Sequence, residues 1–183
     1  MKDEHMTSLS GKRLVSKAHG RIAFRGLIDT LEAEVIEAQV LASEKGEAAI
    51  CGKLGEVLAF LRAVMAAEVK ETPLPQPFLF GMDADEIHRQ SHRTLSSCKE
   101  GNSPSLPAYT QGALAARINT LRAKVREAEL LAVRIFGPGE TGTSDLVPRG
   151  TEERKDIILA LNRLSSALWW LYCEHVSRVS RQY

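Results

Sequence analysis

The segment at residues 154–166, RKDIILALNRLSS, places polar side chains inside a strongly apolar run. Asn162, Arg163, Ser165 and Ser166 stand there among leucine, isoleucine and alanine. A buried amide or guanidinium without a hydrogen-bond partner costs roughly 2 kcal/mol or more, so packing alone does not account for the pattern. We therefore expect these residues to form a site embedded in a helical core.

A second candidate is a pair of arginines one helical turn apart. Arg122 and Arg126 would lie on the same helix face, next to its apolar stripe, where a guanidinium can bind phosphate through two hydrogen bonds. Together with Lys124 and an acidic set centred on Asp29, they could equally form ordinary charge pairs on solvated helix faces. Such pairs contribute on the order of a few tenths of a kcal/mol each. Spacing alone leaves both interpretations open.

A basic row with a spacing of four residues is formed by Lys17, Arg21 and Arg25. It could hold a polyphosphate, or it could be a solvated helix face. The sequence has no P-loop and no Rossmann glycine pattern, so a nucleotide would need a different cradle.

Metal binding and nucleophilic catalysis have little support. His88 and His92 have the spacing of helical metal ligands and have carboxylates nearby, but they lack the HExxH order. We regard them as weak candidates and predict no metal site. No nucleophile elbow or catalytic dyad is present.

The apolar periodicity predicts the elements that position these residues. Leucine, isoleucine and valine recur at three- and four-residue intervals in four long stretches, at about 21–38, 50–69, 114–128 and 157–171. A short helix capped by Asp83 is expected at 84–92. With few aromatic residues and no alternating strand pattern, the chain is predicted to be all-α, a four- to five-helix bundle.

We expect one domain, the helical bundle of residues 17–183, preceded by a polar, mobile segment at 1–16. Residues 137–151, GPGETGTSDLVPRGT, have the composition of a flexible loop within it. A chain of 183 residues can bury roughly 70% of its unfolded surface in a single core. It therefore needs no disulfides to fold.

Composition excludes several classes of protein. The 24 basic and 23 acidic residues give a net charge of +1, which attracts neither nucleic acid nor an anionic membrane. No segment reaches the roughly 20 apolar residues that cross a bilayer, and the N-terminus has no secretion signal. Three widely separated cysteines indicate neither a disulfide framework nor a zinc site, which favours a reducing cytoplasm.

Four runs, taken in order, resemble the ethanolamine-utilisation type of cobalamin adenosyltransferase. This type is related to the propanediol-utilisation type ATP:corrinoid adenosyltransferases. The runs are RLVSKAHGRIAFRGLIDTLEA at 13–33, GMDADEIHRQSHRTL at 81–95, INTLRAKVREAE at 118–129 and DIILALNRLSS at 156–166. The last is the most specific, because the broader family carries a similar Leu-Asn-Arg-Leu-Ser signature.

The resemblance implies a homotrimer of five-helix bundles that binds ATP, with Mg²⁺, and cobalamin at each subunit interface. Cobalt in the Co(I) state would attack the 5′ carbon of ATP and expel the phosphate chain, which makes adenosylcobalamin. The resemblance also implies a flavoprotein reductant and a cobalamin-dependent lyase as candidate partners, and an association with a bacterial metabolic compartment.

Site residues carry over by position in the matching runs. Asp29 and Arg126 correspond to a pair that bridges adjacent subunits beside the active site, and Asn162 to an asparagine near the nucleotide; these three are the expected catalytic residues. Glu129 matches an acid of the family's arginine-rich motif. The residues expected to bind ATP are Lys17, Arg25, Arg122, Arg126, Asn162 and Arg163.

The chain also departs from the family pattern. Leu130 stands where the broader family has a phosphate-binding arginine, and no phenylalanine precedes Leu106 and Pro107, where the family places a ring against cobalamin. The glycine-rich N-terminal ATP loop and the His and Cys cluster of longer relatives are missing. Two alternatives therefore stay open: a non-catalytic trimeric carrier of adenosylcobalamin or ATP, and a structural helical-bundle protein.

Overall fold

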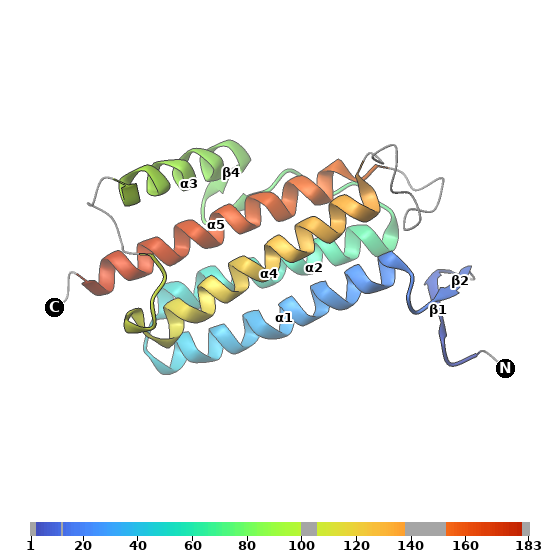
Figure 1. The fold of residues 1–183 in the computed structure, drawn as a ribbon, viewed down its shortest axis with the longest axis horizontal. Coiled ribbons are helices and arrows are strands. Elements are labelled where there is room, and N and C mark those ends of the chain that lie inside the picture. Colours follow the sequence, from blue (N-terminus) through green and yellow to red (C-terminus); the bar gives the residue numbers. More distant parts are fainter. Residues whose placement is uncertain (1–2, 12, 100–105, 138–152, 181–183) are drawn as a thin grey trace.

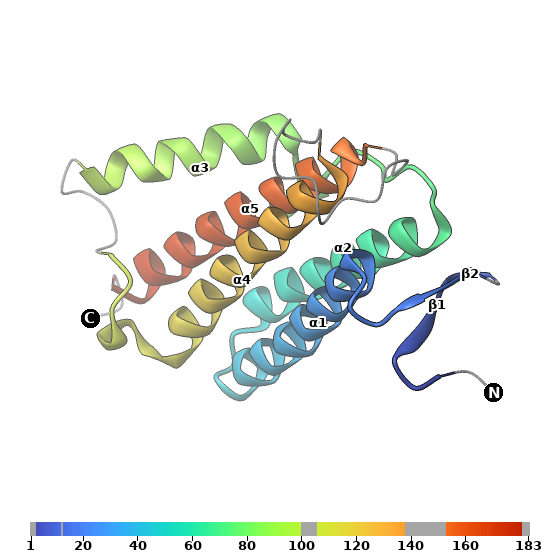
Figure 2. The same cartoon turned by 45° about the vertical axis from the view of Figure 1, so that its right-hand side comes forward.

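Four long helices lie side by side in the computed structural model, which describes residues 3–11, 13–99, 106–137 and 153–180. They are α1 (Gly20–Glu44), α2 (Ala48–Lys70), α4 (Gly112–Phe136) and α5 (Lys155–Ser180). A fifth helix, α3 (Ala84–Lys99), lies outside this group along α5 (Figure 1 and Figure 2). The prediction of an all-α helical bundle is confirmed.

The bundle forms because each long helix has one apolar stripe. α4 packs against α5 on one side and α1 on the other, while α2 packs against α1. The stripes carry fully buried side chains at three- and four-residue intervals, as an amphipathic helix requires. Representative members are Phe24, Ile28 and Leu31 of α1, Leu54 and Leu61 of α2, Ile118, Leu121 and Val125 of α4, and Leu161, Leu164 and Leu168 of α5.

The helix ends follow local chemistry. Gly46, with a φ of +69°, makes the turn between α1 and α2 at the predicted break. Asp83 caps α3 as expected, because its carboxylate accepts the backbone N–H groups of Asp85 at 3.0 Å and Glu86 at 2.8 Å. α3 continues to Lys99, seven residues past the predicted end at 92.

Two short β-hairpins were not predicted from the sequence. Strands β1 (Met6–Ser10) and β2 (Arg13–Ser16) form an antiparallel pair within segment 1–16. Strands β3 (Phe78–Leu79) and β4 (Met82–Asp83) form another pair before α3. The mobility of segment 1–16 stays a prediction. The expected loop at 137–151 lies outside the described residues except for Gly137, where α4 ends.

Candidate functional site

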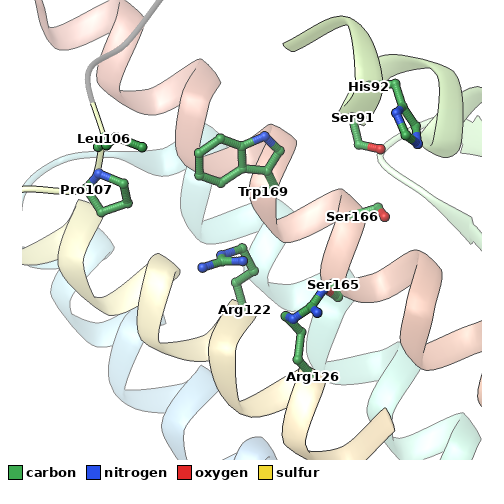
Figure 3. A pocket seen from close by; sticks show the side chains of 9 residues that line it. All are labelled: Ser91, His92, Leu106, Pro107, Arg122, Arg126, Ser165, Ser166 and Trp169. Carbon is green, nitrogen blue, oxygen red and sulfur yellow. The ribbon is translucent and has the colours of Figure 1, made fainter. Parts of the chain in front are cut away.

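A cavity of about 400 Å³ lies between α3, α4 and α5, and two arginines of α4 line it (Figure 3). Trp169 on α5 faces the same space. The other lining residues come from α3, from the segment before the short 3₁₀ helix η1 (Tyr109–Gln111), and from α5. The lining residues are Ser91, His92, Leu106, Pro107, Arg122, Arg126, Ser165, Ser166 and Trp169.

The electrostatics of this cavity favour an anion. Its described lining contains two guanidinium groups and no carboxylate. Burial, and then the nearby charge of Arg126, lower the pKa of Arg122 from its ordinary value. The guanidinium groups of Arg122 and Arg126 therefore repel each other in a partly desolvated environment. An anion that bridges them would relieve this repulsion.

Trp169 forms a flat, fixed wall of the cavity. Its ring stacks on Tyr172 with centroids 5.4 Å apart and planes 20° from parallel. The guanidinium carbon of Arg122 lies 5.5 Å from the Trp169 ring centroid, and its Nε donates to Asn119 Oδ1 at 3.0 Å. The indole Nε1 is buried and has no acceptor within the described part of the chain. The cavity thus offers one aromatic face.

A second cavity, of about 380 Å³, lies between α4 and α5 near their Gly137 and Lys155 ends. It contains the polar interruption that the sequence singled out. Asn162 Nδ2 donates to Glu129 Oε1 at 2.9 Å, and Arg163 Nη1 donates to Asn162 Oδ1 at 2.5 Å. The lining residues are Glu129, Val133, Gly137, Lys155, Ile158, Leu159 and Asn162.

The two cavities border the same pair of helices about one turn apart. On α4, Glu129 follows Arg126 by three residues, and on α5, Ser165 and Ser166 follow Asn162 by three and four. Residues at these intervals are neighbours on a helix face. A cationic cavity with an aromatic wall therefore adjoins a mostly apolar cavity that contains an amide and a carboxylate. Two chemically different parts of one ligand, or two ligands, would fit this arrangement.

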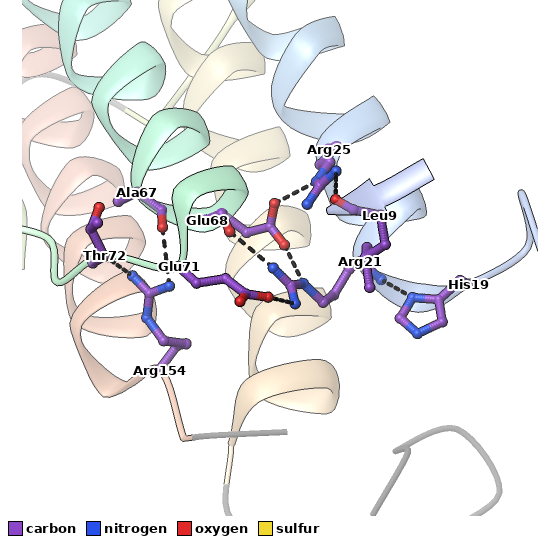
Figure 4. A network of polar contacts seen from close by, with 9 residues as sticks. All are labelled: Leu9, His19, Arg21, Arg25, Ala67, Glu68, Glu71, Thr72 and Arg154. Carbon is purple, nitrogen blue, oxygen red and sulfur yellow. Dashed lines mark hydrogen bonds and ion pairs between the residues drawn. The ribbon is translucent and has the colours of Figure 1, made fainter. Parts of the chain in front are cut away.

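The basic row at the start of α1 has a different environment. Arg21 and Arg25 both donate to the buried carboxylate of Glu68 on α2, and Arg21 also donates to Glu71 Oε1 at 2.6 Å (Figure 4). Burial opposes the charge of Arg21, but its hydrogen bonds to the carboxylates of Glu71 and Glu68 outweigh burial and raise the pKa of Arg21. Lys17 is exposed in the turn before α1. These residues line neither α4–α5 cavity.

Comparison with known proteins gives the family. The family described as cobalamin adenosyltransferase matches residues 1–175. The chain belongs to the cobalamin adenosyltransferase family. The corrinoid adenosyltransferase EutT of Salmonella typhimurium strain LT2 is 31% identical over 169 residues, and that of Escherichia coli K12 is 30% identical over 169 residues. Each alignment covers 92% of this chain, and the chain spans 57% of the length of these relatives.

Family membership gives a context to the residues expected from the sequence, without testing their individual roles. Arg122 and Arg126 share one cavity, and Asn162 lies in the adjoining one beside Arg163. Asp29 is exposed on α1 and lines neither cavity. Its expected pairing with Arg126 concerns adjacent subunits and stays a prediction.

Several weaker expectations can also be placed. Lys124 forms the ordinary type of helix–helix ion pair, here with Glu34 of α1. The rings of His88 and His92 are in contact, with centroids 4.4 Å apart. Within the described ranges no group of three or more His, Cys, Asp or Glu side chains is arranged to hold a metal ion. None of the described helices combines the length and hydropathy that crossing a membrane requires.

Sequence reasoning missed some residues that line a cavity or are buried in the bundle. Trp169 lines the cationic cavity, although nothing in its spacing distinguishes it from a core or interface anchor. Ser91 and His92 reach the same cavity only because α3 packs along α5, which periodicity does not show. Glu68 did leave a signal, because it follows Leu61 and Val64 at helical intervals and so belongs to the buried stripe of α2.

Proposed function

We propose that this protein is an ATP:cob(I)alamin adenosyltransferase that transfers the 5′-deoxyadenosyl group of ATP to the cobalt of a corrinoid. The observation that carries the proposal is the cationic cavity with its aromatic wall, next to the cavity of Asn162 and Glu129, in a chain of the cobalamin adenosyltransferase family. The names of the relatives, corrinoid adenosyltransferases, support the same substrate class.

In this proposal the phosphate chain of ATP lies near Arg122 and Arg126. The unopposed charge in their cavity supports this placement, since phosphate oxygens accept two hydrogen bonds from a guanidinium. Lys17 and Arg163 would add further positive charge. Asn162 would hold the nucleoside part through its amide, which already lies in a mostly apolar cavity.

The reaction needs no nucleophilic side chain. The electron pair of Co(I) attacks C5′ of ATP, a Co–C bond forms, the C5′–O bond breaks, and triphosphate leaves with the bonding electrons. The protein contributes by aligning the two substrates and by stabilising the negative charge on the leaving group. Arg122 and Arg126 are suited to the second task, and Trp169 offers a flat apolar surface beside them.

We propose that Mg²⁺ enters with ATP. Mg²⁺ usually keeps several waters and binds through substrate phosphates plus one or two carboxylates, so it does not require a cage of protein ligands. Which phosphate product leaves depends on whether the phosphate chain is later cleaved.

The proposal extends to the assembly. A homotrimer would place the exposed Asp29 of one subunit near the exposed Arg126 of another. As the family resemblance implies, a flavoprotein would supply reduced cobalt and a cobalamin-dependent lyase would use the product. Both would work in the cytoplasm, where a bacterial metabolic compartment could bring them together.

The decisive experiment follows Co–C bond formation by absorbance. Purified protein is mixed with ATP, Mg²⁺ and cob(I)alamin under anaerobic reduction. We expect product well above the protein-free rate, and we expect Arg126→Ala to reduce kcat by about 100-fold, the effect of losing one charge-stabilising donor. The matched control is Arg62→Ala, an arginine of α2 that is paired with Glu32 away from both cavities.

The other outcomes have definite meanings. Binding of ATP or cobalamin without product would support the carrier alternative. Binding of neither would leave the structural alternative. If the Arg126→Ala variant is as active as the Arg62→Ala variant, the cationic cavity has no role in the mechanism.

A further inference from the structure

Arg25 joins three parts of the molecule that are distant in the sequence (Figure 4). Its Nε donates to Glu68 Oε2 on α2 at 2.5 Å, and its Nη1 donates to the backbone carbonyl of Leu9 in β1 at 2.8 Å. The Glu68 side chain is 0% exposed, so this carboxylate is a fixed acceptor. Arg25 on α1 therefore connects the β1–β2 hairpin to the bundle.

The hairpin depends on such a connection. A single two-stranded hairpin is at best marginally stable in water. This one adds an irregularity between Ser8 and Ser10 and ends in the exposed turn that contains Lys17. Within it, Leu9 is the buried side chain, at 2% exposure. The Leu9 side chain, by its burial, and the Leu9 carbonyl, by its hydrogen bond from Arg25, thus attach the hairpin at the same point.

The geometry of Arg25 does not suit a phosphate contact. Two of its three nitrogens already have protein acceptors. The third, Nη2, is buried and has no acceptor among the described residues. A phosphate could reach it only if the hairpin moved away. The charge of Arg25 is also offset by the carboxylate of Glu68, which would repel an anion.

We propose that Arg25 is a positioning residue that latches the β1–β2 hairpin to α1 and α2, and so fixes Lys17 at the hairpin's end. The backbone N–H of Lys17 donates to the His5 carbonyl at 2.8 Å, which continues the hairpin ladder to Lys17 itself. The position of Lys17 is therefore tied to the docking of the hairpin. The proposal that Arg25 holds the hairpin is based on these contacts alone. Only its expected effect on ATP binding rests on the proposed function.

Hydrogen exchange of the nucleotide-free protein tests the latch directly. We expect Arg25→Gln to speed exchange of the amides of residues 6–16 by about tenfold, the usual effect of losing a charge-assisted hydrogen bond. Leu9→Ala should also speed exchange of these amides, because it removes the buried side chain at the same attachment point. The double variant should exceed the larger single effect by little, because both changes release the same docked state.

The matched control is Arg62→Gln. Arg62 also links α2 to α1, through Glu32 at 3.3 Å, but it is exposed and does not contact the hairpin. In the Arg62→Gln variant, the amides of the hairpin should exchange at the wild-type rate. Arg25→Lys keeps the charge near Glu68, but its single nitrogen replaces the two nitrogens by which Arg25 reaches Glu68 and Leu9, so it should be intermediate. Exchange in the helices shows whether each variant is folded.

The latch is overturned if hairpin exchange in Arg25→Gln equals that of the wild type while Leu9→Ala speeds it. Steady-state kinetics then separate the two roles. A latch predicts that Arg25→Gln and Leu9→Ala both raise KM for ATP with little change in kcat. A direct phosphate contact predicts that only Arg25→Gln does so. If the wild type transfers no adenosyl group, the proposed function fails while the exchange experiment still decides the latch.

Discussion

At the scale of single residues, Asn162 shows what can be predicted from the sequence and what cannot. An amide and a guanidinium in an apolar run must find partners, and Asn162 does bond to Glu129 and Arg163. The partner on α4 lies 33 residues earlier, and only the packing of α4 on α5 brings it close. Composition and spacing predict that a site exists, whereas its second half depends on tertiary structure.

The basic residues show the same limit, because arginines with the same spacing in the sequence have different surroundings in the structure. Arg122, Arg126 and Arg25 were all expected to contact phosphate. The first two face a cavity without a carboxylate, while the third is held by Glu68 and Leu9. Local spacing is the same in each case. What differs is the residue on the facing helix, which the sequence pattern does not give.

The Asn162–Glu129 pair separates a binding role from a packing role. Asn162→Leu alone should destabilise the protein by about 1 kcal/mol, because Glu129 loses its donor. Asn162→Leu with Glu129→Leu should recover only part of that stability, since Glu129 is no longer left without its donor but Arg163 Nη1 still loses its acceptor. Adenosyl transfer should be lost in both variants. Urea unfolding and the cobalamin assay measure the two effects, and an active double variant would exclude a role in binding.

At the scale of elements, periodicity predicted the four long helices because each buries a stripe of apolar side chains, whereas α3 was predicted from its Asp83 cap. The hairpins were missed for a physical reason. Strands of two to five residues carry too few alternating positions to stand out, and β1–β2 depends on docking through Leu9 and Arg25. Helix ends were less accurate than helix centres, as the extension of α3 to Lys99 shows.

Asp156 ties the start of α5 to the end of α2. Its Oδ2 accepts the backbone N–H of Leu74 at 2.8 Å and Arg154 Nη2 at 2.9 Å. Arg154 in turn donates to the carbonyl of Thr72 at 2.8 Å. Burial disfavours the carboxylate, but the hydrogen bonds from Arg154 and from the backbone of Leu74 and Ile157 outweigh it and lower the pKa.

The contribution of the Asp156 hydrogen bonds to the free energy of unfolding should depend on pH. The folded pKa is below the unfolded one, so the contribution is complete above the ordinary aspartate range of about 4 and is lost as the pH falls through the folded pKa. Asp156→Asn should therefore cost about 1–3 kcal/mol at pH 7 and progressively less below about pH 4. Denaturant unfolding from pH 7 to 3.5 measures this, with the exposed Asp85→Asn as control. A difference that stays constant with pH would contradict it.

At the scale of the whole molecule, α1 and α4 each present an exposed face with an unusual composition. On α1, Asp29, Ile36 and Val40 are spaced by seven and four residues and are all exposed. On α4, Arg126, Leu130 and Val133 are spaced by four and three and are also exposed. Each set follows one helix face, so each helix presents two apolar side chains and one charge to its surroundings.

These two faces support the expected subunit contact, because an exposed anion and an exposed cation, each with apolar neighbours, suit each other in a rotational assembly. We predict a trimer by sedimentation or light scattering. Asp29→Arg and Arg126→Asp should each weaken it through like-charge repulsion, and the double reversal should restore it. Asp85→Arg, on the exposed face of α3, is the control for added charge. If the double reversal is no better than either single change, Asp29 and Arg126 do not face each other across the interface, and a trimer must be held by other residues.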